Sequence, residues 1–233
     1  MQILEYSPFG LRSVRIVLES RESDITVTLF PMVHLGEAAF FASVYEDAFA
    51  HDVVLVEGVR SPITQRITRV YRWCASSSRL ALSLQPPYPL DSTVRARVIH
   101  ADLTGEEFAA AWGRLLLWMR LALYVGSPAM ALWLRIFGTR QMIAKHLAMD
   151  DALSQDELVN WSPETGVLDE AMLNARDTRL IERLEDVLDS ADPAVQRVAI
   201  VYGAGHVRAV LRALTGRRRF FAKGSEWLTV FSL

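Results

Sequence analysis

The side chains that could do chemistry in this sequence are two histidines and a glutamate, His34, Glu57 and His206. Each follows a short run of apolar, β-branched residues, which is the pattern of a buried strand. Imidazole and carboxylate groups serve as general bases and as metal ligands. Because ligands of open α/β sheets bind at the carboxyl ends of the strands, we expect these three side chains to face one another across a single cleft.

Each of the three residues also has a structural interpretation. A single histidine at a strand end is as often a structural residue as a functional one. An unpaired charge at the end of a buried strand is costly, so Glu57 could cap a helix or pair with an arginine. Three such residues at equivalent strand ends favour a functional site over three separate structural roles.

The stretch around His206 is the most informative part of the chain. Its strand is expected at 198–202, and Gly203 and Gly205 permit the tight exit of a strand-to-helix turn. Apolar residues then recur at helical spacing over 207–214. His206 is therefore expected between the carboxyl end of a strand and the start of a helix.

Two further charged residues are candidates for the same site. Arg176 falls on the apolar stripe of a helix expected at 167–188. A buried arginine needs an anionic partner, which Glu57, Asp102 or a bound anionic substrate could supply. Alternatively, the Arg176 side chain extends to the edge of the stripe and reaches water. Asp102 follows another expected strand, at 94–99.

The remaining periodicities predict an α/β fold with a mixed, mainly parallel central sheet flanked by helices and an apolar helical hairpin insertion. We expect a single domain over 1–233, with a mostly helical insertion at 104–160. A capping box opens the helix that follows Thr104, and a second one begins at Ser154. Further strands are expected at 14–18, 25–30, 53–56 and 227–231, and a further helix at 38–50.

Composition limits the class of protein. The net charge is −2, which argues against a nucleic-acid partner. Cys74 is the only cysteine, so no internal disulfide can form, which fits a reducing compartment. The first residues lack the basic and apolar regions of a signal peptide. These features predict a cytoplasmic protein.

The segment at 115–137 is apolar on nearly all sides. Arg120, Arg135 and the break at 126–128 interrupt it, whereas a membrane span needs about 20 mainly apolar residues. The pattern favours two short buried helices. The alternative is an apolar hairpin that contacts a membrane surface, as in a peripheral membrane protein, or that forms a homodimer.

Four segments occur in order along the chain: Met32-Val-His34 with Val54-Leu-Val-Glu57, Ala101-Asp102 with Thr104 and Trp112, Asn174-Ala-Arg176-Asp177, and Gly203-Ala-Gly-His206. Together they resemble the TraB/PrgY/GumN family, which is related to the Tiki metalloproteases and similar to erythromycin-esterase-like proteins. The sequence departs from the family pattern at Pro31, where a glycine is usual, and at Leu103, where an arginine is usual. The resemblance implies an α/β domain whose histidines and glutamate form the active site.

Two mechanisms for hydrolysis of a peptide or ester bond follow from this resemblance. In the first, His34, Glu57 and His206 hold a divalent metal such as Zn²⁺, Mn²⁺ or Co²⁺, which activates water. Arg176 then stabilises the oxyanion and Asp102 orients a histidine ligand. In the second, no metal binds: one histidine acts as general base, Glu57 fixes its tautomer and Arg176 binds charge.

A non-catalytic function is the alternative to both mechanisms. The same crevice could hold a peptide or a small molecule without turnover, as a regulatory or peptide-binding module. In that case the apolar segment at 115–137 would be the surface that contacts a partner or a membrane.

Overall fold

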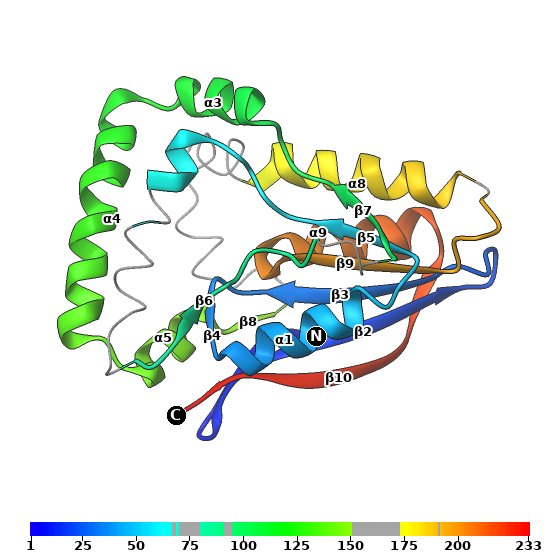
Figure 1. Ribbon diagram of the computed structural model, residues 1–233, viewed down its shortest axis with the longest axis horizontal. Helices are drawn as coiled ribbons and strands as arrows, with labels where there is room; N and C mark the ends of the chain where they lie inside the picture. Colours follow the sequence, from blue (N-terminus) through cyan, green and yellow to red (C-terminus); the bar gives the residue numbers. More distant parts are fainter. Residues whose placement is uncertain (67–68, 70–79, 91–94, 151–172, 191) are drawn as a thin grey trace.

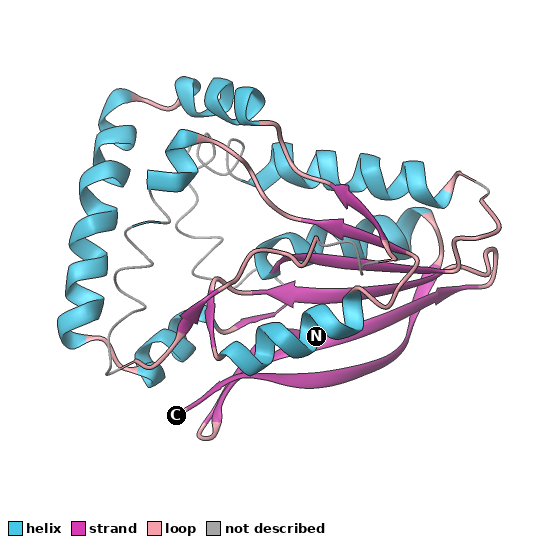
Figure 2. Cartoon of the chain, in the orientation of Figure 1, coloured by secondary structure: helices cyan, strands magenta, loops and turns pink. Residues whose placement is uncertain are grey.

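The computed structural model describes residues 1–66, 69, 80–90, 95–150, 173–190 and 192–233. The fold is α/β, with a mixed, mainly parallel central sheet flanked by helices, as the sequence predicted (Figures 1 and 2). The sheet has eight strands, and its order is β7-β5-β9-β3-β2-β1-β8, with β10 paired to β2.

The parallel part of the sheet carries the candidate site. Its strands run in the order β7-β5-β9-β3, and the two inner strands β5 and β9 are mostly apolar and buried, as expected for parallel strands with helices on both faces. The register aligns Met32 with Gly203, and Val56 with Val201 and His100. The carboxyl ends of these strands therefore meet at one edge of the sheet. The strands are β3 (Thr26–Met32), β5 (Val53–Val56), β7 (Arg97–His100) and β9 (Arg197–Gly203).

Antiparallel strands extend the sheet beyond β3. The pair expected at 14–18 and 25–30 is confirmed as β2 and β3, and the closing strand pairs with β2 along its whole length. The sequence patterns did not predict β1 and β8, the last two strands in this order, or a small second sheet of β4 and β6. These strands are β1 (Gln2–Ser7), β2 (Gly10–Ser20), β4 (Leu35–Gly36), β6 (Ser83–Leu84), β8 (Met149–Asp150) and β10 (Phe220–Ser232).

Helices cover the parallel strands on both faces. Helix α1 (Ala38–Ala48) connects β3 to β5 and contacts β3 and β9. Helix α8 (Ala175–Leu188) contacts β5 and α9 (Val207–Arg212) on the opposite face (Figure 1). The apolar stripe of α8 is formed by its buried residues Leu180, Leu184 and Val187. This packing holds the first turn of α8 over the carboxyl edge of the sheet.

The helical insertion contains α3 (Gly105–Arg114), α4 (Leu117–Phe137) and α5 (Arg140–Leu147). The capping box predicted at Thr104 is present, with Glu107 as its reciprocal partner. The residues of the insertion beyond 150, and the capping box expected at Ser154, lie outside the described residues.

The expectation of two short buried helices at 115–137 was wrong. Helix α4 continues through Pro128, and only Met119 and Ala131 among its residues are buried. Proline at this position removes one backbone hydrogen bond. The Ser127 hydroxyl donates to the Leu123 carbonyl at 2.6 Å, which satisfies a carbonyl next to the lost bond. The sequence motif at 126–128 therefore does not end the helix.

Candidate functional site

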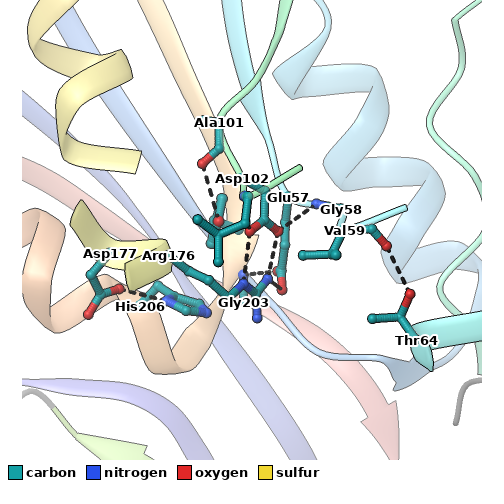
Figure 3. A network of polar contacts seen from close by, with 12 residues as sticks. Glu57, Gly58, Val59, Thr64, Ala101, Asp102, Arg176, Asp177, Gly203 and His206 are labelled. Atoms are coloured by element: carbon teal, nitrogen blue, oxygen red, sulfur yellow. Dashed lines mark hydrogen bonds and ion pairs between the residues drawn. The ribbon is translucent and has the colours of Figure 1, made fainter. Parts of the chain in front are cut away.

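The carboxyl edge of the parallel strands gathers the residues that the sequence singled out. His34 lies two residues beyond β3, and Glu57 directly follows β5. Asp102 lies two residues beyond β7, and His206 lies in the short turn after β9. Arg176 reaches the same edge from the first turn of α8 (Figure 3).

Arg176 bridges the two carboxylates of this edge. Its Nη2 donates to Glu57 Oε1 at 2.5 Å and to Asp102 Oδ2 at 2.7 Å, and its Nε donates to Asp102 Oδ1 at 2.9 Å. Two of the three anionic partners considered for Arg176 are therefore present together. The guanidinium and the two carboxylates together carry a net charge of −1, which disfavours the predicted role of Arg176 in binding an oxyanion.

Backbone amides complete the hydrogen bonding of both carboxylates. Glu57 Oε2 accepts from the Gly203 amide at 2.6 Å, which links the ends of the neighbouring strands β5 and β9. Asp102 accepts from the amides of Gly58 at 3.0 Å and Leu103 at 2.8 Å. A Cβ atom on Gly203 would lie 3.0 Å from Glu57 Oε2, so glycine is what allows this close approach. The network ties three strand ends and α8 together.

The charges of this network are mutually stabilised despite their burial. The side chain of Asp102 is only 1% exposed. Burial raises the pKa of Asp102, but the hydrogen bonds and charge of Arg176 and the two amides outweigh it and hold that pKa below its usual value. Burial lowers the pKa of Arg176, whereas Asp102 and Glu57 raise it, and the net result is a raised pKa. Arg176 and Asp102 are therefore both ionised at neutral pH.

The pH dependence of stability is the first testable consequence. Because Asp102 has a lower pKa in the folded chain than in the unfolded one, its contribution is present above the ordinary aspartate value of 3.8 and is lost as the pH falls through the folded pKa. We expect Asp102→Asn to make the loss of stability in acid shallower, as measured by urea unfolding across a pH series. The exposed Asp186→Asn is the control, and equal slopes in the two variants would contradict the assignment.

His206 is held by Asp177, a residue for which the sequence alone predicted no role. Its Nδ1 lies 2.6 Å from Asp177 Oδ1, and the histidine is 4% exposed. The Tyr202 ring packs edge-on against the imidazole, with a centroid separation of 4.8 Å. Glu57 was expected to fix a histidine tautomer and Asp102 to orient a histidine, but both instead bind Arg176. The sequence feature that could have indicated this pairing is the position of Asp177, directly after Arg176 at the start of α8.

His34 occupies the same edge but makes different contacts. Its side chain is exposed, and its Nδ1 lies 3.3 Å from the Gln85 amide oxygen. The Gln85 amide nitrogen donates to the Tyr88 hydroxyl at 3.3 Å. Burial and then the charge of Glu57 raise the pKa of Tyr88. Gln85 and Tyr88 therefore connect His34 to the neighbourhood of Glu57.

The predicted metal ligands do not form a metal-binding arrangement here. Within the described part of the chain, no three His, Cys, Asp or Glu side chains are grouped so as to hold a metal ion. Both oxygens of Glu57 are engaged, one by Arg176 and one by the Gly203 amide. The donor set His34, Glu57 and His206 thus does not fit a divalent metal in this conformation.

Comparisons of the chain with models of protein families, with curated proteins and with solved structures found no match. The resemblance to the TraB/PrgY/GumN family stays a hypothesis that depends on the four sequence segments.

Proposed function

We propose that the protein is a hydrolase of peptide or ester bonds in which His206, oriented by Asp177, acts as general base on water. The observation that supports this proposal is the 2.6 Å contact between His206 Nδ1 and Asp177 Oδ1 at the carboxyl edge of the sheet. An ionised carboxylate can only accept a hydrogen bond. It therefore favours the tautomer with a proton on Nδ1 and a lone pair on Nε2.

The chemistry would use that lone pair. His206 Nε2 takes a proton from the attacking water, and the resulting imidazolium returns it to the leaving group. Asp177 stabilises the imidazolium that forms. The net negative charge of the Glu57–Arg176–Asp102 network also stabilises the positive charge of this imidazolium. In this mechanism Arg176 is a positioning residue, since it holds the strand ends and α8 together.

A metal-dependent mechanism remains a separate proposal. It would require His34, Glu57 and His206 to come closer together than they lie here, because the described residues contain no group of three such side chains that could hold a metal ion. Elemental analysis of the tag-free chain tests this point. Stoichiometric metal that is lost in His34→Ala and His206→Ala would favour the metal mechanism over the general-base mechanism.

A binding module without turnover is the second candidate. It is favoured by the closed hydrogen bonding of the network, because every carboxylate oxygen of Glu57 and Asp102 already has a donor. Such a rigid network could shape a binding site without taking part in a reaction, so that a bound molecule leaves unchanged. A wild-type chain that binds members of a peptide and ester panel but hydrolyses none of them would support this candidate.

Asp177→Asn tests the hydrolase proposal directly. Asparagine can donate to Nδ1 and so favours the tautomer with its proton on Nε2, which removes the base. We expect kcat on the best substrate of the panel to fall at least about 100-fold with the fold intact. Asp186→Asn, on the same helix, is the matched control and should keep the wild-type kcat. Similar rates for Asp177→Asn and wild type would exclude this mechanism.

A further inference from the structure

Helix α4 presents its apolar side chains outward. Leu117, Leu121 and Val125 are 71, 61 and 65% exposed. Helices of globular proteins normally turn the apolar face to the core and charged residues to water. Here the charged residues of the helix, Arg120 and Arg135, are partly buried instead of fully exposed. The other large exposed apolar residues of α4 are Trp118, Tyr124, Met130, Leu132, Trp133, Ile136 and Phe137.

The length of α4 matches a bilayer. Among the described residues, α4 is the one helix long and apolar enough to cross a membrane. Its 21 residues, at about 1.5 Å each, span roughly 31 Å. Trp118 and Trp133 lie near its two ends, and tryptophan is enriched where hydrocarbon meets headgroups. A lipid environment is therefore chemically suitable for the outer surface of this helix.

The fold prevents α4 from spanning a bilayer. On one side, α3 is fixed to the domain by the ion pair of Glu107 with Arg179 and by packing with Val59. On the other side, α5 contributes Ile143 and Ala144 to the main core. A spanning α4 would separate α3 from α5 by the hydrocarbon thickness of about 30 Å, with one domain on both sides. Figure 1 shows α4 joined at its two ends to α3 and α5, which both return to the same domain. In this fold, a contact of α4 with a membrane would therefore run along the bilayer surface and not across the bilayer.

Charge favours lipid over a second copy of the chain. No acidic residue occurs between Glu107 and Asp150, a stretch that contains four arginines and a lysine, although the whole chain has a net charge of −2. Among these cations, Arg114 on α3 and Lys145 on α5 are exposed and flank α4, whereas Arg140 pairs with Glu37. A symmetric contact through α4 would bring this basic segment against itself. Anionic headgroups attract such a segment instead. We propose that α4 docks the protein, lying flat, on the surface of an anionic lipid bilayer.

Vesicle flotation of the full chain tests this proposal. Wild type is expected to float with vesicles of equal parts phosphatidylserine and phosphatidylcholine, and less with phosphatidylcholine alone or in high salt. Leu121→Glu with Val125→Glu should reduce the bound fraction about tenfold or more, because both changes remove apolar area and add negative charge. These positions are exposed, so folding should persist. Phe9→Glu with Phe221→Glu, exposed apolar residues on other elements, is the matched control and should float as wild type does.

Four outcomes would overturn the proposal. The first is a wild-type chain that does not float with the anionic vesicles. The second is equal flotation of the α4 variant and wild type. The third is a bound fraction that is the same with phosphatidylcholine alone and in high salt, which would remove the role given to anionic headgroups. The last is a wild-type dimer in solution that the α4 substitutions dissociate while vesicle binding is absent, which would assign the surface to a second copy of the chain.

Discussion

Arg176→Met is expected to lower the free energy of unfolding by about 3–5 kcal/mol, because it leaves two buried carboxylates without their cation. The side chains of Glu57 and Asp102 are 11 and 1% exposed, so water cannot replace the guanidinium. The stability of Arg176→Lys should lie between those of wild type and Arg176→Met, because one ammonium cannot reproduce the planar contacts to both acids. Equilibrium unfolding in guanidinium chloride at neutral pH measures each variant.

Arg183→Met is the matched control, since it makes the same change on the same helix. Arg183 is 45% exposed, and its contact with Asp186 is 3.5 Å. We expect it to change stability by no more than about 0.5 kcal/mol. Adding Glu57→Gln and Asp102→Asn to Arg176→Met should recover a large part of the loss, because no buried charge remains unpaired. A loss in Arg176→Met no larger than in the control, or no recovery, would contradict the role given to this ion-pair network.

His206→Asn is expected to reduce kcat for hydrolysis by about 10²–10⁴-fold, the usual contribution of a general base. The asparagine amide can still donate to Asp177, so the partly buried carboxylate keeps a partner and the fold should persist. The reduction should appear in kcat rather than in KM, because the base acts only in the transition state. The measurement is steady-state kinetics on the best substrate of the peptide and ester panel, with circular dichroism to confirm folding.

Two matched variants separate the possible causes of such a loss. His146→Asn changes an exposed histidine on α5 and should keep the wild-type kcat. His34→Asn changes the other histidine of the edge, and the general-base mechanism predicts a smaller loss than for His206→Asn. Equal losses in His34→Asn and His206→Asn, together with loss of bound metal, would favour the metal-dependent mechanism instead.

Local sequence determined much of the fold around the site. Buried strands were predicted at Val53–Val56 and Val198–Tyr202, because these apolar runs are too short for a typical helix and are rich in β-branched residues. Both segments are strands here. The capping box at Thr104 predicted the start of α3, since its two hydrogen bonds involve only nearby residues. The strand β8 was not predicted because its partner β1 lies far away along the chain. The strand β1 pairs locally with β2 in a hairpin, which the sequence patterns did not indicate.

The position of a residue relative to its strand also carried information about the site. His34, Glu57, Asp102 and His206 each follow a strand, and parallel strands place such residues at one edge whatever loops connect them. The sequence could not specify which of them pair. Arg176 had Glu57, Asp102 or a substrate anion as candidate partners, and the packing of α8 on the sheet brings it to both acids at once.

Sequence alone therefore determined the chemical types of the site and the edge at which they gather, because secondary structure and strand direction follow from local patterns. Tertiary structure decided the contacts: Asp177 rather than Glu57 holds His206, and Glu57 is bound by Arg176 and Gly203. It also decided that α4 is continuous and exposed, although its sequence is compatible with buried helices. The physical reason is that burial and pairing are properties of residues distant in the chain, which only the packing of helices on the sheet brings together.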